Sequence, residues 1–377
     1  VVDGAQQAVV PGVNTYTFTS IAANHTISAH FLVNPSVGPV TSLMAEITTT
    51  GNDTTGTARI AITFTKPSPS VTVKVYRAPF GGYPMYDKAS TPGAEPSAPS
   101  YPPSSPWTLT DVAASGDLDH PATRDAWYYV AFAVDQYGTV SSASTLSAGT
   151  PNYHLGDVSN GVTAGHGDNQ VDLADISLLG AHYGETLGSG SAYHYLDIGP
   201  TVEGDLTSRP SVDGVVDFED FIIAALSFEL VARPQASVHP LIAAASHDEV
   251  SLEVADARMG DVTAVLRLQG TGSLHGISTT LTWDPTVVEP VSVATGELLE
   301  QQMGVVYSAK PGVIDVVRLG KGADGLLGDG PMAIVKFRRL AVGDARIGIA
   351  SVDARDAKNH KVNLGFGVDR HPVVPSI

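Results

Sequence analysis

An aspartate pattern that occurs twice constrains this chain more than any other feature. The copies share one offset of 45 residues: Asp168, Asp172 and Asp175 in the first, and Asp213, Asp217 and Asp220 in the second. An apolar stripe with helical spacing follows each copy, so each loop is expected to lead into a short amphipathic helix. Calcium needs roughly six to eight hard oxygen ligands around one ion, and loops of this kind supply them. The repeat therefore predicts two calcium-binding loops and about two calcium ions (Ca2+) per chain.

The spacing also assigns ligand positions within each loop. If the last aspartate is position 12 of an EF-hand-type loop, positions 5 and 9 are aspartates and position 7 contributes a backbone carbonyl. These donors are Asp168, Gln170 and Asp172 in the first loop, and Asp213, Val215 and Asp217 in the second. The candidates for position 1 are Asp157 and Asp197, which lie 11 and 16 residues before position 5. Each loop is thus expected to carry an insertion.

The insertions leave position 3 open, because Ser159 or Asn160 could fill it in the first loop and Thr201 or Asp205 in the second. In the first loop Asn169 replaces the turn glycine, a change that Asn tolerates because it can adopt a left-handed conformation. A simpler interpretation is that the aspartates only cap helices, with their carboxylates facing the positive end of the helix dipole. Two copies with one spacing, in a chain with surplus acidic residues, favour calcium.

The composition indicates several β domains with an acidic surface. The 39 Asp and Glu against 21 Lys and Arg give a net charge of −18, which repels nucleic acids and anionic membranes. The 377 residues exceed what one hydrophobic core supports. The 38 Gly and 25 Pro are typical of turn-rich β domains. Cysteine is absent, which excludes disulfides and thiolate metal sites, and no apolar run is long enough for a membrane span.

Alternating and helical patterns divide the chain into six segments. The expected fold is mainly β, with several β-sandwich domains and a small α-helical unit in the middle. The segments are 1–35, a partial β module; 39–150, a β-sandwich; 153–230, the loop–helix unit; 231–247, a linker; 248–366, a second β-sandwich; and 367–377, a polar tail. Residues 79–106 are too rich in proline to join a sheet, so they form either an exposed contact surface or an insertion packed over the sandwich.

The loop–helix unit resembles a dockerin, a module whose calcium loops end on Asp rather than Glu, as both copies do here. In dockerins the two residues before the last aspartate help to select the cohesin partner. The resemblance therefore implies partner-binding roles for Leu173, Ala174, Phe218 and Glu219, which differ from the Ser-Thr pair common in cellulosome dockerins. Leu173 and Phe218 could instead belong to the core.

Three further segments resemble known modules. Residues 248–366 resemble a cohesin, the partner domain of dockerins, in the ordered motifs at 257–261, 274–277, 281–285, 293–296 and 336–337. Residues 39–150 resemble a fibronectin type III domain in their strand order and in the tyrosine-rich strand 127–134, which precedes a turn at 135–138. Residues 1–34 resemble the closing half of an internalin-type B-repeat.

The sequence contains no catalytic constellation. The common hydrolase and nucleotide-binding motifs are absent. A G-x-G-x-x-G run at 320–325 precedes an expected strand, not a helix whose N-terminus could hold a phosphate. His154 and His166 border the first loop, but imidazole is a poor ligand for a hard cation. The protein is predicted not to be an enzyme.

A dockerin-like and a cohesin-like module on one chain predict a secreted, calcium-stabilised assembly protein at the surface of a bacterial cell. If each unit docks on the sandwich of the next chain, a head-to-tail filament or surface scaffold results, and the partner is another copy or a protein with a cohesin or dockerin. Alternatively, the unit packs on its own sandwiches and stiffens a stalk. The chain could also be the accessory region of a larger secreted glycoside hydrolase or peptidase. Tyr83, Tyr86, Tyr101 and Trp107 raise the hypothesis of a polysaccharide ligand.

Overall fold

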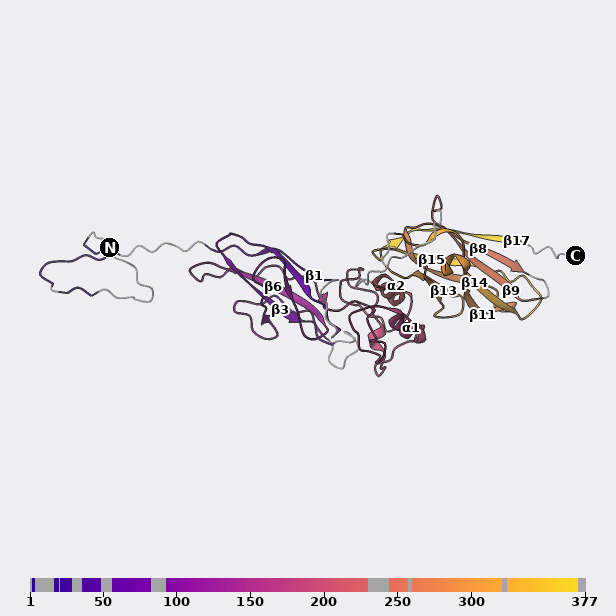
Figure 1. The fold of residues 1–377 in the computed structure, drawn as a ribbon, viewed down its shortest axis with the longest axis horizontal. Coiled ribbons are helices and arrows are strands. Elements are labelled where there is room, and N and C mark those ends of the chain that lie inside the picture. Colours follow the sequence, from indigo (N-terminus) through magenta and orange to yellow (C-terminus); the bar gives the residue numbers. More distant parts are fainter. Residues whose placement is uncertain are drawn as a thin grey trace.

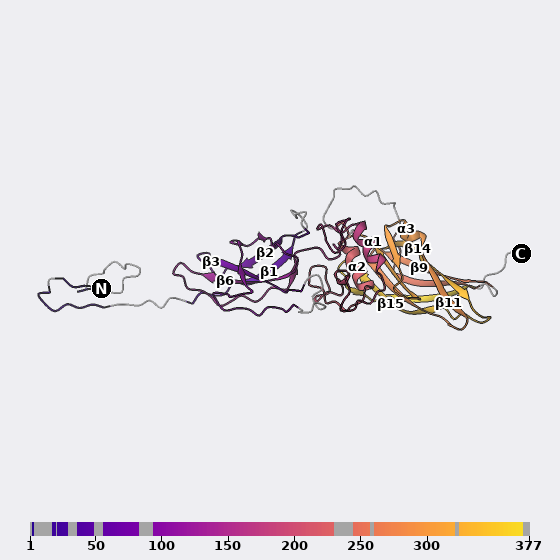
Figure 2. The same ribbon diagram turned by 90° about the horizontal axis from the view of Figure 1, so that it is seen from below.

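The computed structural model describes residues 2–3, 17–19, 21–28, 36–48, 56–82, 93–229, 244–256, 260–320 and 324–371. The described parts form an elongated molecule in which three units follow one another along the long axis (Figure 1 and Figure 2). They are the N-terminal sandwich (residues 40–151), the loop–helix unit (residues 153–229) and the C-terminal sandwich (residues 249–371). Strands far outnumber helices, which confirms the mainly β fold.

The N-terminal sandwich packs two antiparallel sheets against each other. One sheet has the order β1–β2–β5, formed by Thr41–Ile47, Ile60–Thr65 and Asp117–Asp119. The other has the order β4–β3–β6–β7, formed by Thr108–Leu109, Thr72–Pro79, Ala126–Val134 and Thr150–Pro151. Alternate side chains of β2 and β3 are apolar and fill the core between the sheets, as the period of two in a strand requires.

Strand β6 is buried on both faces. Tyr129 belongs to the main core of the N-terminal sandwich, whereas Tyr128 and Phe132 belong to a second, smaller core on the opposite face. Tyr101, from the proline-rich segment, covers this second core, and its ring centroid lies 5.3 Å from that of Phe132. The described part of the proline-rich segment is therefore an insertion packed over the sandwich.

This packing corrects the interpretation of the aromatic residues as an exposed contact surface. Tyr101 is half-buried, and Trp107 is buried in the same small core, so neither ring lies open to a sugar ligand. Tyr83 and Tyr86 lie outside the described residues, as do most of the expected linker and tail. Of the partial module at 1–35, the described residues contain one β-bridge, between Val2 and Ile27.

The C-terminal sandwich has two five-stranded sheets. The first has the order β12–β13–β10–β15–β16, formed by Gly304–Tyr307, Val313–Arg318, Leu274–Thr282, Gly348–Asp356 and Lys361–Val362. The second has the order β11–β14–β9–β8–β17, formed by Val288–Thr295, Leu327–Arg339, Val262–Thr271, Glu249–Asp256 and Gly365–His371. A short helix, α3 (Glu297–Glu300), packs on β14 and β12. Strand β17 pairs with β8 in parallel, so the two ends of this sandwich lie side by side.

The loop–helix unit contains α1 (Leu173–Ala181), the 3-10 helix η1 (His194–Leu196) and α2 (Phe218–Ser227). Helix α2 is buried on nearly every side because it lies between α1 and the C-terminal sandwich. Helix α1 buries Ile176, but Leu173 is 64% exposed, so the alternative that Leu173 belongs to the core is wrong. None of the helices in the described ranges is long and apolar enough to cross a bilayer.

Candidate metal centre

The two aspartate-rich loops begin their helices in the same way. Asp172 is the N-cap of α1 and accepts a hydrogen bond from the N–H of Ala174 at 2.8 Å. Asp217 caps α2 equivalently and accepts from Glu219 at 3.1 Å. In both helices the aspartate at the third helical position accepts from the N–H of the cap residue, which completes a capping box. Helix capping is therefore one role of these aspartates.

The last aspartate of each loop also holds the start of that loop. Asp175 Oδ1 accepts hydrogen bonds from the N–H groups of Val158 and Ser159, both at 2.8 Å. Asp220 Oδ1 accepts from Ile198 at 2.6 Å and Gly199 at 2.8 Å. In each loop, the last aspartate is thus hydrogen-bonded to the backbone directly after the first aspartate, Asp157 or Asp197. This closure places the two predicted position-1 residues at equivalent points, although their distances from position 5 differ.

The first aspartate of each loop holds the inner turn. Asp157 accepts from Asp168 N–H at 3.0 Å and Asn169 N–H at 2.7 Å. Asp197 accepts from Gly214 N–H at 2.7 Å. Asn169 and Gly214 occupy matching places and both have positive φ, 65° and 85°, which is the left-handed conformation expected at the turn.

The inner predicted ligands follow this turn in both loops. Asp168 accepts from Gln170 N–H at 3.1 Å, and Asp213 accepts from Val215 N–H at 2.9 Å. The two loops therefore share one backbone arrangement across the residues predicted for positions 5 to 12.

Position 3 stays open in both loops, because all four candidates make local contacts. Asn160 Oδ1 accepts from two N–H groups of its own turn, and Ser159 Oγ accepts from Gly161. In the second loop Thr201 Oγ1 donates to the carbonyl of Asp205, whose carboxylate accepts from two backbone N–H groups. These contacts shape the insertions, which leave the loops and return to them.

Burial disfavours the charged form of the loop carboxylates, so a cation beside them would stabilise that form. Burial raises the pKa of Asp157 to about 7 and that of Asp175 to about 6, and the two carboxylates repel each other. Asp220 is fully buried, so its pKa lies well above the ordinary value, with Asp197 adding repulsion. Charges out of water need a partner of opposite sign, and a divalent cation is one. The donor set is all oxygen, which fits calcium better than zinc or copper.

The side chains do not form a closed coordination shell. Within the described ranges no three acidic or histidine side chains converge closely enough to hold an ion between them. The aspartates at both ends of each loop are turned toward backbone N–H groups instead. The residues therefore fit calcium in chemistry and in order along the loop, and calcium binding stays a prediction.

The first loop is joined to the N-terminal sandwich by one arginine. Arg124 lies just before β6 and forms an ion pair with the carboxylate of Asp157. It also donates to the backbone oxygens of Asp157, at 2.7 Å, and of Gly56. Its guanidinium lies over the ring of Tyr153, 4.9 Å from the centroid. A predicted metal ligand thus contacts a cation from the neighbouring sandwich.

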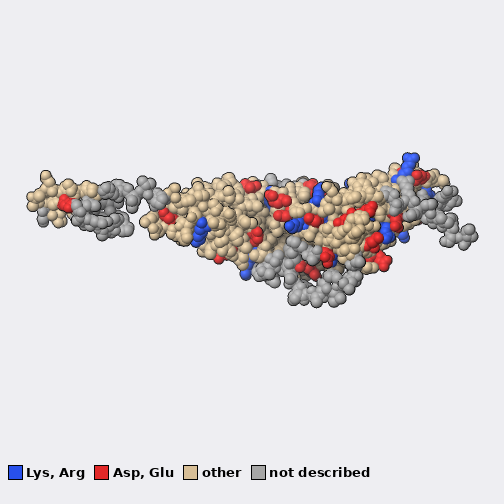
Figure 3. Space-filling model, turned by 90° about the horizontal axis from the view of Figure 1, so that it is seen from above, with Lys and Arg blue, Asp and Glu red and all other residues tan. Residues whose placement is uncertain are grey.

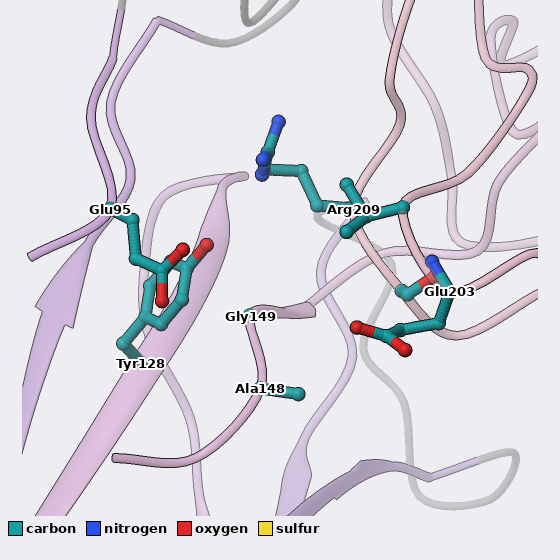
Figure 4. Close-up of a pocket in the computed structure, with 8 residues that line it drawn as sticks. Glu95, Tyr128, Ala148, Gly149, Glu203 and Arg209 are labelled. Atoms are coloured by element: carbon teal, nitrogen blue, oxygen red, sulfur yellow. The ribbon is translucent and has the colours of Figure 1, made fainter.

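The insertion of the second loop also reaches the N-terminal sandwich. The guanidinium of Arg209 stacks on Phe80, 4.1 Å from the ring centroid. Figure 4 shows Arg209 extending from this insertion toward Glu95 and Tyr128, across a cavity of about 70 Å³. That volume has room for a few water molecules rather than an organic ligand. Residues of both units line the cavity, which therefore belongs to the contact between them.

The opposite side of the loop–helix unit docks on the β12–β13–β10–β15–β16 sheet. Strand β10 carries Gly276 at the contact, where a Cβ atom would lie 2.5 Å from Cδ1 of Ile222 and 3.2 Å from Phe218. Tyr307 of β12 packs on Phe221, with ring centroids 4.7 Å apart. Apolar residues of α2 and of β13 share one continuous core. Each of these contacts is made within a single chain.

Polar contacts border this apolar docking. Tyr183 donates a hydrogen bond to Asp315 at 2.9 Å, and Arg355 pairs with Glu219 at 3.2 Å. Burial raises the pKa of Asp315 to about 6. On the face shown in Figure 3, acidic side chains are spread over the middle and C-terminal parts of the molecule. The contact between the two units therefore combines apolar packing with a hydrogen bond and an ion pair.

The four residues predicted to bind a partner separate into two pairs. At the start of α1, Leu173 is exposed and Ala174 is half-buried. Phe218 is 6% exposed and packs against Gly276, and Glu219 pairs with Arg355 of the same chain. Phe218 and Glu219 thus contact the C-terminal sandwich of their own chain, and their binding to a partner chain stays a prediction.

Sequence reasoning missed the residues that join the units. Arg124 carries no motif, and only its position before a strand is visible in the sequence. Tyr307 appears there as an ordinary strand residue. Gly276 lies in one of the cohesin-like motifs, but a glycine inside a strand signals only that some group approaches closely.

No protein-family model matches the chain, and no curated protein matches it. Solved cohesins are similar to about a third of it. The non-cellulosomal cohesin of Archaeoglobus fulgidus is 19% identical, covers 34% of this chain and 93% of its own, and has a TM-score of 0.27. The sixth cohesin of scaffoldin B from Acetivibrio cellulolyticus is 17% identical. The match covers 33% of this chain and 100% of the cohesin, with a TM-score of 0.28. The second type II cohesin of the adaptor scaffoldin ScaA from that organism is 15% identical. The match covers 33% of this chain and 95% of the cohesin, with a TM-score of 0.28. Likeness at this level leaves the function of this chain undefined.

Proposed function

We propose that this chain is a non-catalytic structural protein in which a calcium-binding unit is the rigid joint of an extended stalk. One observation carries the proposal: the loop–helix unit contacts both sandwiches, through Arg124 and Asp157 on one side and through α2 and Gly276 on the other. Calcium stabilises the joint, because the ion in the second loop orders the start of α2, which docks on the C-terminal sandwich.

A secreted or cell-surface location fits this role. Proteins outside the cell meet more free calcium than cytosolic proteins do, and an acidic chain collects divalent cations. Structural calcium also replaces disulfides in stabilising a chain that has no cysteine. The absence of recognisable catalytic motifs in the sequence supports a non-catalytic role.

Docking within one chain favours the stalk over a head-to-tail filament. The sixth cohesin of scaffoldin B was solved in complex with the Cel5 dockerin, which is a contact between two proteins. Here the two docked surfaces belong to one polypeptide and already cover each other, and a contact within a chain has a high effective concentration. The same contacts made between chains would propagate into a filament, so polymerisation is the alternative outcome of the test.

Small-angle X-ray scattering and sedimentation velocity of the full chain, in calcium and in EDTA, test the proposal. We expect a monomer whose scattering in calcium matches the extended arrangement of Figure 1 and whose radius of gyration increases in EDTA. Assemblies that grow with protein concentration and dissolve in EDTA would favour the filament. A profile that is the same with and without calcium would contradict a calcium-stabilised joint.

A further inference from the structure

We propose that Arg124 is a built-in counter-cation of the first loop, which latches the N-terminal sandwich to Asp157 and lowers the calcium affinity of that loop. This inference rests on the proposed function, because it assumes that the loops bind calcium. It makes the calcium affinities of the two loops different, although the aspartate spacing of the two loops is the same.

The geometry around Arg124 fixes the guanidinium in place. Its side chain is nearly buried, and its N–H groups donate to three oxygens, namely a carboxylate oxygen of Asp157 and the backbone oxygens of Asp157 and Gly56. The ring of Tyr153 packs against one face of the guanidinium. Gly167 lies so close that a Cβ atom there would meet both Arg124 and Asp157. A planar fork held by several acceptors is the arrangement in which arginine loses little entropy on pairing.

The two carboxylate oxygens of Asp157 face different partners, so Arg124 and a calcium ion could contact the same carboxylate. Arg124 and the N–H of Asn169 contact Oδ2, whereas Oδ1 accepts from the N–H of Asp168, on the side of the loop where the other predicted ligands follow. Calcium and the guanidinium would therefore share one carboxylate. Two positive charges within a few ångströms repel each other, and burial reduces the screening of that repulsion.

The second loop is the internal reference. Its most buried carboxylate, that of Asp220, is held by the backbone N–H groups of Ile198, Gly199 and Asp217. Arg209, from the insertion of this loop, stacks on Phe80, and the positive charge of Lys310 acts on Asp217, so the cations near the second loop differ from Arg124. Removing Arg124 should therefore change the first loop and leave the second unchanged.

Linkage makes the effect reciprocal. If Arg124 weakens calcium binding in the first loop, calcium in that loop weakens the hold of Arg124 on Asp157 by the same factor. The contact with the N-terminal sandwich is then firmest when calcium is withdrawn. The contact with the C-terminal sandwich depends on α2 and hence on the second loop. The two ends of the joint thus respond differently to one ion.

Isothermal titration of the full chain with calcium chloride tests this inference, with Arg124→Gln as the key variant. We expect two sites in the parent chain, and in Arg124→Gln an increase of about tenfold in the affinity of one site with no change at the other. Asp172→Asn and Asp217→Asn assign the sites, since each removes one predicted ligand from one loop. Arg124→Lys keeps the charge, and its affinities should stay within about threefold of the parent values.

The matched control is Arg77→Gln, which removes another arginine–aspartate pair of the same sandwich, between the half-buried Arg77 and the buried Asp119, away from both loops. It should leave both calcium affinities unchanged, which separates a local charge effect from general loosening of the N-terminal sandwich. A second readout uses spin labels at Tyr137→Cys and Ala181→Cys, two exposed sites in a chain without native cysteine. In EDTA the distance distribution should stay narrow with Arg124 present and broaden in Arg124→Gln.

Two results would overturn the role of Arg124: unchanged affinities in Arg124→Gln, or a lower affinity at the first loop. A chain that binds no calcium at all would instead contradict the proposed function. Because the parent titration is done first, the two failures are distinguishable.

Discussion

Gly276 of β10 lies directly beneath Ile222 of α2, so close that a Cβ atom on the glycine would come within 2.5 Å of the Ile222 methyl carbon. The absence of a side chain at this one position lets the helix lie flat on the sheet. This contact determines how the loop–helix unit sits on the C-terminal sandwich, and it leads to the first prediction.

Gly276→Val should separate α2 from the sheet while the C-terminal sandwich keeps its fold, because valine is well suited to a strand. We expect a larger radius of gyration in calcium and a loss of about 2 kcal/mol in the free energy of unfolding, typical of overpacking. Scattering and chemical denaturation measure the two effects. The matched control is Gly365→Val, also in a strand, where a Cβ atom would meet nothing within 4 Å. Equal behaviour of the two variants would contradict the assigned contact.

Tyr183→Phe should destabilise the same interface through a polar contact. The hydroxyl of Tyr183 donates to Asp315, so its removal leaves a buried carboxylate without that donor. We expect a loss of about 1–3 kcal/mol in the free energy of unfolding, measured by urea denaturation at neutral pH. Tyr137→Phe is the control, because Tyr137 is 75% exposed. A loss below about 0.5 kcal/mol at Tyr183 would show that water replaces the hydroxyl.

Asp220→Asn should remove one calcium ion and release α2. The amide cannot accept all three backbone hydrogen bonds that the fully buried carboxylate accepts, and it carries no charge for the ion. We expect the stoichiometry of calcium, measured by titration or native mass spectrometry, to fall from about two ions to one. Asp111→Asn, at an exposed acid of the N-terminal sandwich, should leave it unchanged. Retention of both ions in Asp220→Asn would exclude this residue as a ligand.

The pH dependence of stability should contain a contribution from Asp125. Burial raises the pKa of this carboxyl to about 6 in the folded chain, against an ordinary value of 3.8. Between about pH 4 and pH 6, Asp125 is thus protonated in the folded state and ionised in the unfolded state. The free energy of unfolding therefore falls as pH rises through this window. Relative to Asp125→Asn, the parent chain should lose at most about 3 kcal/mol across this window. Denaturation at several pH values, at one calcium concentration, measures the difference, and parallel curves for the two chains would contradict it.

The sequence predicted most successfully what is local. The spacing from Asp168 to Asp175 and its copy 45 residues later predicted the helix starts, because an N-cap and the third helical position lie within a few residues of each other. The same local logic predicted the tyrosine-rich strand at 127–134, which is β6. It failed at Leu173, because helical periodicity shows that an apolar stripe exists but not which of its ends a neighbour covers.

Contacts between distant segments could not be predicted in this way. Arg124 and Asp157 are 33 residues apart, and Phe218 and Gly276 lie in different units, so no periodicity connects either pair. Tyr101 resembled a surface tyrosine because it lies among prolines, yet it covers the second face of β6. The choice between docking within a chain and docking between chains depends on such pairs.

The insertion of the first loop is hydrogen-bonded at both of its ends, which makes it a suitable place to graft a foreign peptide. Asp175 fixes the backbone where the excursion leaves, at Val158 and Ser159, and Asp157 fixes it where the excursion returns, at Asp168. Its tip is unencumbered, since Val162 is 92% exposed and a Cβ atom on Gly161 would meet nothing within 4 Å. Length added at this tip strains neither end, and loop closure becomes only slowly less favourable with length. An epitope spliced there would be presented from the middle of a long, narrow particle, well away from both of its ends.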